Sequence, residues 1–125
     1  MEQWIIPCNI KYYDVVGAFK ELKCLDWKQS CKSINVGDEV YIYIGKPIGA
    51  IKYKCKVNKV NLDCIEIDDS RFVINGEPYE SYGNHMELEL LEEYEDTKYS
   101  LNVLRANGLT GNIQGPRRVN GIIKQ

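Results

Sequence analysis

Residues 36–44 read VGDEVYIYI, a turn signal followed by β-branched and aromatic residues. Val-Gly-Asp is typical of a turn, because glycine tolerates backbone conformations that other residues avoid and aspartate bonds to nearby backbone groups. After the turn, three aliphatic residues alternate with Tyr41 and Tyr43. Successive side chains of a strand point to opposite faces, so this alternation predicts a strand over residues 39–44 with an aliphatic face and a tyrosine face.

A second strand pattern, over residues 50–60, carries a stripe of lysines. Apolar residues that we expect to face a core occupy alternate positions of this pattern: Ile51, Tyr53, Cys55 and Val57. Lys52, Lys54 and Lys56 occupy the positions between them. Neighbours on one face of a strand lie roughly 6.6–6.8 Å apart, about the spacing of phosphates along one nucleic-acid strand. The stripe predicts either phosphate contacts or lysines that protect an exposed strand from aggregation.

Shorter patterns complete the chain. Those that predict regular structure are strands over 4–8 and 86–90, a helix over 14–22 capped by Asp14, a helix over 100–107 capped by Ser100, and an extended segment over 115–119. Residues 25–33 predict a loop or short helical turn, and residues 61–85 an insertion with a hairpin at Asn75-Gly76. Five to seven mostly antiparallel strands with two or three short helices predict an α+β fold. We expect a small barrel or curled sheet that forms one domain over residues 1–125.

Charge is segregated along the 125 residues. Residues 1–60 carry a net charge of +4, residues 61–99 carry −10, and residues 100–125 carry +4, for a total of −2. The total excludes a uniformly basic nucleic-acid coat. The segregation indicates an anionic partner or, alternatively, acidic and basic residues that solvate different sides of the domain.

Cysteine and histidine limit the chemistry. The five cysteines are odd in number and form no C-x-x-C pair, so we expect reduced thiols, a cytoplasmic protein and no metal or other cofactor. His85 is the only histidine, and any Ser/His/Asp or Cys/His catalytic set would have to use it. It ends the stretch Tyr-Gly-Asn-His at residues 82–85, which is typical of a loop, so we expect a solvated histidine and no catalytic residue. No apolar run approaches the roughly 20 residues of a membrane helix, and the first residues do not resemble a signal peptide.

Two further features are candidates for ligand binding. Trp27 lies in the polar stretch 26–30, where it is either a lid over the core or a platform on which a base stacks, with Gln29 and Ser30 beside it to bond the base edge. Arg117 and Arg118 follow Gly-Pro, and adjacent residues of an extended segment point to opposite sides. One arginine can thus bind phosphate while the other pairs within the protein, unless both belong to a plain basic surface loop.

The sequence resembles the EVE domain of the PUA-like superfamily. Three segments carry the resemblance, namely the opening 4–9 with its tryptophan, the Val-Gly-Asp turn and aromatic strand within 34–43, and the arginine-bearing 116–119. The resemblance implies a small β-barrel flanked by short helices. It also implies recognition of nucleic acid that carries a modified base, typically cytosine modified at position 5. In modification-dependent restriction, such a domain reads the mark, and a nuclease domain or subunit cuts.

The resemblance extends to single residues. Asn9 matches the end of the family's first strand, where a Ser-Glu pair lines the pocket, and Tyr43 matches an aromatic after the turn. The family's Gly-Val-Arg-Asn signature is absent, and residues 27–30 occupy roughly its place. Arg117 and Arg118 match the family's arginine segment in character.

These observations lead to one main hypothesis, a non-catalytic reader of a modified cytosine in DNA. In it, a base flipped out of the duplex stacks between Trp27 and Tyr43. The residues expected to bond the base edge are Asn9, Gln29 and Ser30. The residues expected to hold phosphates are Lys52, Lys54, Lys56, Arg117 and Arg118. The alternatives are an RNA-binding module of the PUA type and an ASCH-like hydrolase of a modified nucleoside, which would need a lysine of lowered pKa.

Overall fold

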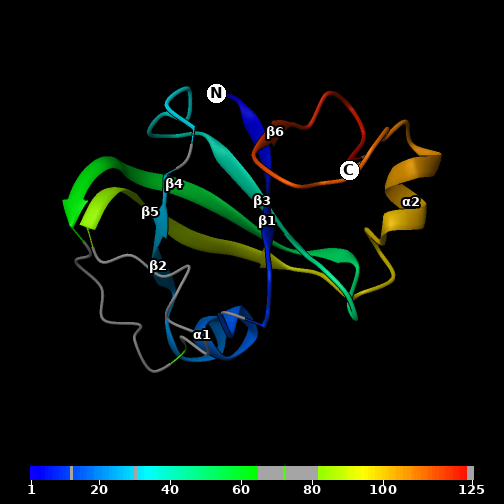
Figure 1. The fold of residues 1–125 in the computed structure, drawn as a ribbon, viewed down its shortest axis with the longest axis horizontal. Helices are drawn as coiled ribbons and strands as arrows, with labels where there is room; N and C mark the ends of the chain where they lie inside the picture. Colours follow the sequence, from blue (N-terminus) through cyan, green and yellow to red (C-terminus); the bar gives the residue numbers. More distant parts are fainter. Residues whose placement is uncertain (12, 30, 65–71, 73–81, 124–125) are drawn as a thin grey trace.

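The computed structural model describes residues 1–11, 13–29, 31–64, 72 and 82–123. Its elements in chain order are β1 (Gln3–Cys8), α1 (Val15–Glu21), β2 (Cys24–Lys28), β3 (Glu39–Ile44), β4 (Ala50–Cys64), β5 (Tyr82–Glu93), α2 (Leu101–Ala106) and β6 (Arg117–Arg118). The strands form one sheet in the order β2-β5-β4-β3-β1-β6. Only the β1–β3 pair is parallel among these strands. The predicted α+β fold class is confirmed (Figure 1).

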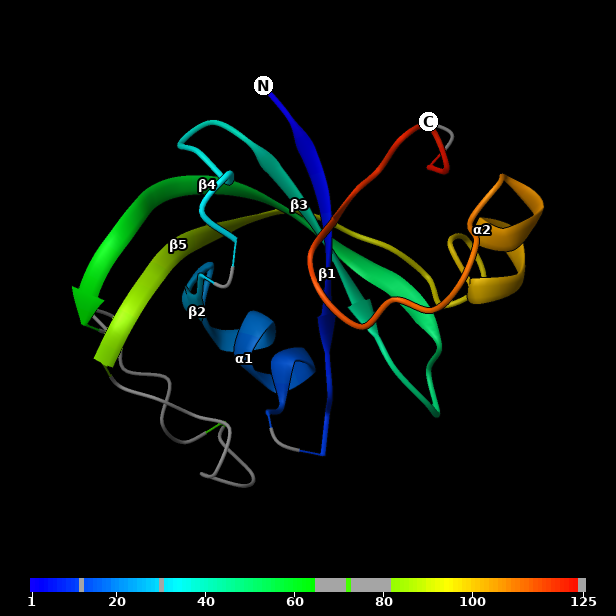
Figure 2. The same ribbon diagram turned by 45° about the horizontal axis from the view of Figure 1, so that its top comes forward.

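The sheet is curled but, within the described residues, not closed. Figure 2 shows β4 and β5 bending together over the same side of the molecule. Their register shifts at several points, from Lys54/Cys55 to Leu62/Cys64. Register shifts of this kind bend a strand and increase its twist, which accounts for the curvature. The sheet keeps two edges, β2 and the two-residue β6.

Both faces of the sheet are covered by a hydrophobic core. The first, which we call the α1-side core, joins α1 to the aliphatic residues of β3: Val15, Ala18, Phe19, Val40, Ile42 and Ile44. The second, the α2-side core, joins α2 and the tail to the tyrosines of β3: Leu104, Leu109, Ile113, Val119, Tyr41 and Tyr43. The predicted alternation of β3 is therefore confirmed, and each of its faces belongs to a different core. Figures 1 and 2 show α1 and α2 well apart, on either side of β1.

One prediction for β4 is wrong because of a bulge. Ile51 was expected to share a face with Tyr53, Cys55 and Val57. In the structure Tyr43 pairs with Ile51 whereas the preceding Ile42 pairs with Tyr53, so Lys52 is an extra residue on β4. The bulge moves Ile51 into the α2-side core, while Cys55 is fully buried in the α1-side core as expected.

Two segments that we predicted as loops are strands. Residues 25–28 of the predicted loop 25–33 belong to β2, which pairs antiparallel with β5. His85 is not a solvated loop residue: it lies on β5 opposite Lys28 and is only 2% exposed. In both cases strand pairing decided the conformation of a short stretch in which polar and apolar residues are mixed. The hairpin predicted at Asn75-Gly76 lies outside the described residues.

The helix boundaries agree with their predicted caps. The side chain of Asp14 accepts a hydrogen bond from Gly17 N at 3.0 Å, and that of Ser100 accepts one from Val103 N at 3.3 Å. Such bonds satisfy backbone donors that a helix start leaves without partners. In the part of the chain that the structure describes, no helix is long and apolar enough to cross a membrane.

A buried carboxylate joins the start of β1 to the turn before β3. Asp38 accepts hydrogen bonds from Glu2 N at 3.0 Å, from the Trp4 indole Nε1 at 3.0 Å and from Asn35 N at 2.9 Å. Burial by itself raises the pKa of Asp38, but these hydrogen bonds outweigh it and leave the pKa below its usual value. The Val-Gly-Asp turn is therefore more than a chain reversal, because its aspartate holds β1 and β3 in parallel register.

We expect Asp38→Asn to lower the free energy of unfolding at neutral pH by about 1–3 kcal/mol, because an amide cannot accept all three hydrogen bonds. Asp96→Asn is the matched control, since Asp96 is 52% exposed and is paired with Lys52. Because the folded pKa of Asp38 is lowered, its stabilisation is present above the unfolded pKa of about 3.9 and lost as pH falls through the folded pKa. Urea denaturation between pH 3 and 7 measures this, and equal stability of Asp38→Asn and Asp96→Asn at pH 7 would contradict it.

Candidate functional site

An aromatic pair lies at the rim of the α1-side core. The Trp27 side chain on β2 is partly buried and packs against this core. Its ring meets that of Tyr13 edge-on, with the centroids 5.8 Å apart and an interplanar angle of 79°. Tyr13 precedes the helix cap, and its backbone N donates to Asn9 O at 3.3 Å. The end of β1, the turn before α1 and β2 thus converge at this point.

The two amide side chains predicted to bond a base are differently placed. Gln29 is buried, its Oε1 accepts from Asn61 N at 2.9 Å, and its Nε2 donates to Cys31 O at 3.4 Å. Both ends of this amide hold the protein together. Asn9 is exposed, and its Oδ1 accepts from Lys11 N at 2.9 Å. Its amide nitrogen donates no hydrogen bond to the described residues and can therefore donate one to a ligand. Ser30 lies outside the described residues.

Tyr43 does not share a site with Trp27. It belongs to the α2-side core, whereas Trp27 packs against the α1-side core. The two rings lie on opposite faces of the sheet, so the structure does not support a base stacked between them. Burial raises the pKa of Tyr43, and the nearby positive charge of Arg105 opposes this increase. The ring beside Trp27 is instead that of Tyr13, which lies five residues after the end of β1 and was not among the predicted site residues.

Two of the three lysines of the stripe are paired with carboxylates of the chain itself, and the third, Lys56, is exposed. Lys52 Nζ lies 3.0 Å from Asp96 Oδ1. Lys54 Nζ lies 3.5 Å from Glu39 Oε2 and 3.6 Å from Glu92 Oε1, and its side chain is only 11% exposed. A phosphate at either lysine would have to compete with these carboxylates.

Lys54 also has the wrong titration for a catalytic lysine. Burial by itself lowers its pKa, but Tyr41, Glu39 and Glu92 together raise it above the usual value. A lysine that acts as a base or nucleophile needs the opposite shift. Burial likewise raises the pKa of the Cys8 thiol to about 12, so this cysteine is not a thiolate at neutral pH. No group of three metal-ligating side chains occurs within the described residues.

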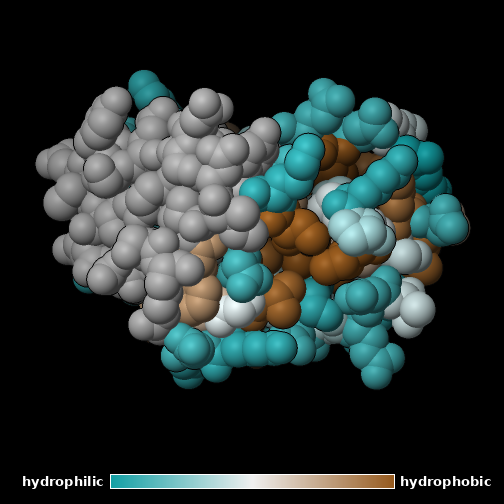
Figure 3. All heavy atoms as spheres, turned by 60° about the horizontal axis from the view of Figure 1, so that its bottom comes forward, coloured by the Kyte–Doolittle hydropathy of each residue, from teal (hydrophilic) through white to brown (hydrophobic). Residues whose placement is uncertain are grey.

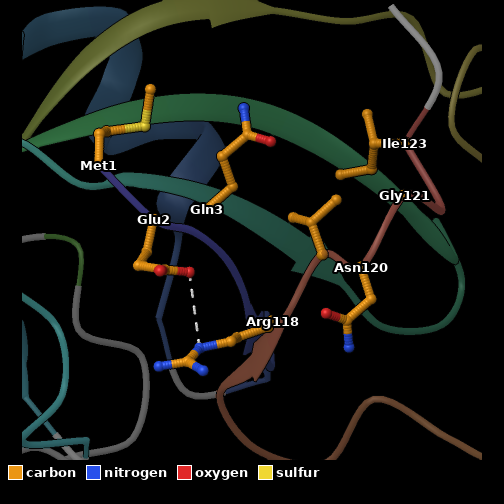
Figure 4. A pocket seen from close by; sticks show the side chains of 8 residues that line it. Met1, Glu2, Gln3, Arg118, Asn120, Gly121 and Ile123 are labelled. Carbon is orange, nitrogen blue, oxygen red and sulfur yellow. Dashed lines mark ion pairs between the residues drawn. The ribbon is translucent and has the colours of Figure 1, made fainter.

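The two arginines of β6 point to opposite sides, as adjacent strand residues should. Arg118 of β6 lies opposite Trp4 of β1 in the antiparallel pair, and its guanidinium is 5.0 Å from the centre of the indole ring. Its Nε is 3.7 Å from Glu2 Oε2, beside an open hollow of about 410 Å³ (Figure 4). Arg117 instead donates from Nη1 to Thr110 O at 3.1 Å.

The face drawn in Figure 3 is apolar in its middle. Hydrophobic side chains gather there between hydrophilic ones.

The comparisons with known proteins establish the fold. No protein-family model and no curated protein matches the sequence. A hypothetical protein from Leishmania major is similar in structure, with a TM-score of 0.66 and 14% identity over 98% of this chain and 89% of that one. An ASCH protein from Zymomonas mobilis gives a TM-score of 0.62 and 8% identity over 94% of this chain and 87% of that one. The chain thus has the small, barrel-like ASCH or PUA-like fold, as predicted.

Removing Lys54 should cost more stability than removing Lys52. Lys54→Ala leaves the mostly buried carboxylate of Glu39 without its cation, which we expect to lower the free energy of unfolding by about 1–3 kcal/mol. Lys52→Ala breaks a pair with the exposed Asp96, and pairs of that kind contribute about 0–1 kcal/mol. Urea denaturation of both variants measures the difference. Equal losses would show that Lys54 is not a structural cation.

Proposed function

We propose that this protein is a nucleic-acid-binding module without catalysis, and that an unstacked base binds at Trp27 beside Tyr13. The observation that carries the proposal is the partly exposed, edge-to-face aromatic pair at the rim of the α1-side core. The contact with Tyr13 restrains the indole before any ligand arrives. A restrained ring loses little conformational entropy when a base stacks on it.

The energetics require contacts besides the stack. Flipping a base out of a duplex costs a few kcal/mol, and stacking on an aromatic side chain returns about 1–3 kcal/mol. The exposed Asn9 amide, close to Tyr13, supplies a hydrogen-bond donor for a base edge. Lys32 is exposed three residues after Gln29 and supplies positive charge for a flanking phosphate. A single-stranded ligand would avoid the flipping cost.

For the base, we propose a cytosine modified at position 5 in DNA. This follows from the sequence resemblance to EVE domains, and a nuclease domain or subunit of a restriction system would be the corresponding partner. A methyl group buried in an apolar setting contributes about 0.8 kcal/mol, so we expect a preference of several-fold for the modified base. The PUA-type alternative, in which the ligand is RNA, is an outcome of the same test.

The binding test compares duplex DNA with and without 5-methylcytosine, single-stranded DNA and RNA of matched length. We expect Trp27→Ala to weaken binding of the preferred ligand about 5- to 150-fold, as loss of one stacked base predicts. Trp27→Phe should keep most of the affinity because it retains a ring. Fluorescence anisotropy measures the dissociation constants, and circular dichroism checks the fold.

Leu91→Ala is the matched control, because Leu91 is an exposed apolar side chain on β5. If Trp27→Ala and Leu91→Ala both bind like the wild type, the base site is not at Trp27. If methylated and plain DNA bind equally and RNA binds more tightly, the modified-cytosine proposal is wrong and the RNA-binding alternative replaces it. If none of the four nucleic acids binds, the proposed function is wrong.

A further inference from the structure

Two arginines from different elements meet at one loop on the α2 side of the sheet. Arg105, in the last turn of α2, donates from Nη2 to Asn112 Oδ1 at 3.3 Å. Arg117, on β6, donates from Nη1 to Thr110 O at 3.1 Å. Thr110 and Asn112 are two residues apart, so their backbone positions are at most about 7 Å apart. Figure 2 shows this segment running back from α2 toward β6.

Both guanidiniums are oriented by neutral acceptors and not by carboxylates. Within the described residues, neither Arg105 nor Arg117 forms an ion pair, and residues 100–125 contain no acidic residue at all. Lys52, Lys54 and Arg118 differ, because each has a carboxylate within 4 Å. Two like charges held near one loop repel each other, and an anion placed between them would relieve that repulsion.

Each guanidinium keeps unused hydrogen-bond donors. Arginine has five N–H donors in a planar fork, and the bonds above use one on each side chain. The remaining donors suit an anion with several acceptor oxygens, which arginine binds in bidentate geometry. The partly buried Arg117 is held in place by β6 and by Thr110, so its charge is already positioned before a ligand binds.

We infer that Arg105 and Arg117 form a phosphate-binding site on the loop 110–112, and that the phosphate belongs to a nucleic-acid backbone. The identity of the ligand as nucleic acid rests on the proposed function. The existence of an anion site does not, because it is argued from the two arginines alone. The site lies on the opposite side of the sheet from Trp27, so it adds affinity without reading a base. The nucleic acid must therefore extend around the domain, with the read base at one face and a flanking phosphate at the other.

The experiment measures the salt dependence of single-stranded DNA binding by the wild type, Arg105→Gln, Arg117→Gln and the double variant. Each phosphate contact contributes about 0.7 to the slope of log K against log salt for single strands. We expect the double variant to lose roughly 0.7 of this slope, with equal losses for plain and methylated strands. Lys98→Gln is the control. The Lys98 ammonium lies 5.2 Å from the centre of the Tyr94 ring, which belongs to the α2-side core, and we expect this variant to keep the wild-type slope of log K against log salt.

A second readout separates this inference from the proposed function. Pyrophosphate titrated into the wild type should shift the backbone amide NMR signals of residues 110–112, and the double variant should show no such shift. If the pyrophosphate shifts are absent, the phosphate site is wrong. If the double variant keeps the full slope while Trp27→Ala loses affinity, the phosphate site is wrong and the base site stands. If the shifts appear but no nucleic acid binds, the anion site stands and its assignment to nucleic acid is wrong.

Discussion

The carboxylate of Asp38 is the contact on which the arrangement of the sheet depends. It binds the backbone of the first residues, the indole of Trp4 and the turn that precedes β3. These bonds fix the one parallel pair of the described sheet, β1 beside β3. Parallel neighbours cannot be joined by a tight turn, so their register needs an anchor from elsewhere in the chain. Trp4, held in this way, is also the surface on which Arg118 stacks, and β6 completes the sheet beside β1.

A central sheet with a core on each face separates the two candidate sites. α1 covers one face and leaves the Trp27–Tyr13 pair at its rim, while α2 and the tail cover the other and bring Arg105 and Arg117 to one loop. The bulge at Lys52 contributes to this division because it turns Ile51 toward the α2-side core. A base-reading contact and a phosphate contact can thus be changed independently. The proposed binding mode requires these two contacts to lie at separate places on the domain.

Several elements could be predicted from the sequence because their signals are local. The alternation in β3, the caps at Asp14 and Ser100, and the burial of Cys55 all follow from backbone periodicity and from hydrogen bonds within one turn. β2 and His85 could not be predicted in this way. β2 forms a strand because it pairs with β5, and the stretch around His85 does so because it lies on β5 between β2 and β4. The position of Tyr13 beside Trp27 depends on a contact between the turn before α1 and β2, and no local pattern in the sequence links these two segments.

The sequence by itself determined the fold class and the two faces of β3. It also supplied the aromatic side chain of Trp27 and, in residues 100–125, a set of basic residues with no acidic residue among them. Only the tertiary structure decided which of these residues act together. It placed Trp27 and Tyr43 on opposite faces, paired Lys52 and Lys54 with carboxylates from β3, β5 and the segment after β5, and brought Arg105 and Arg117 to the loop 110–112. The physical reason is that periodicity specifies which way a side chain points within its own element. Its partners come from strand pairing and helix packing between residues far apart in the chain.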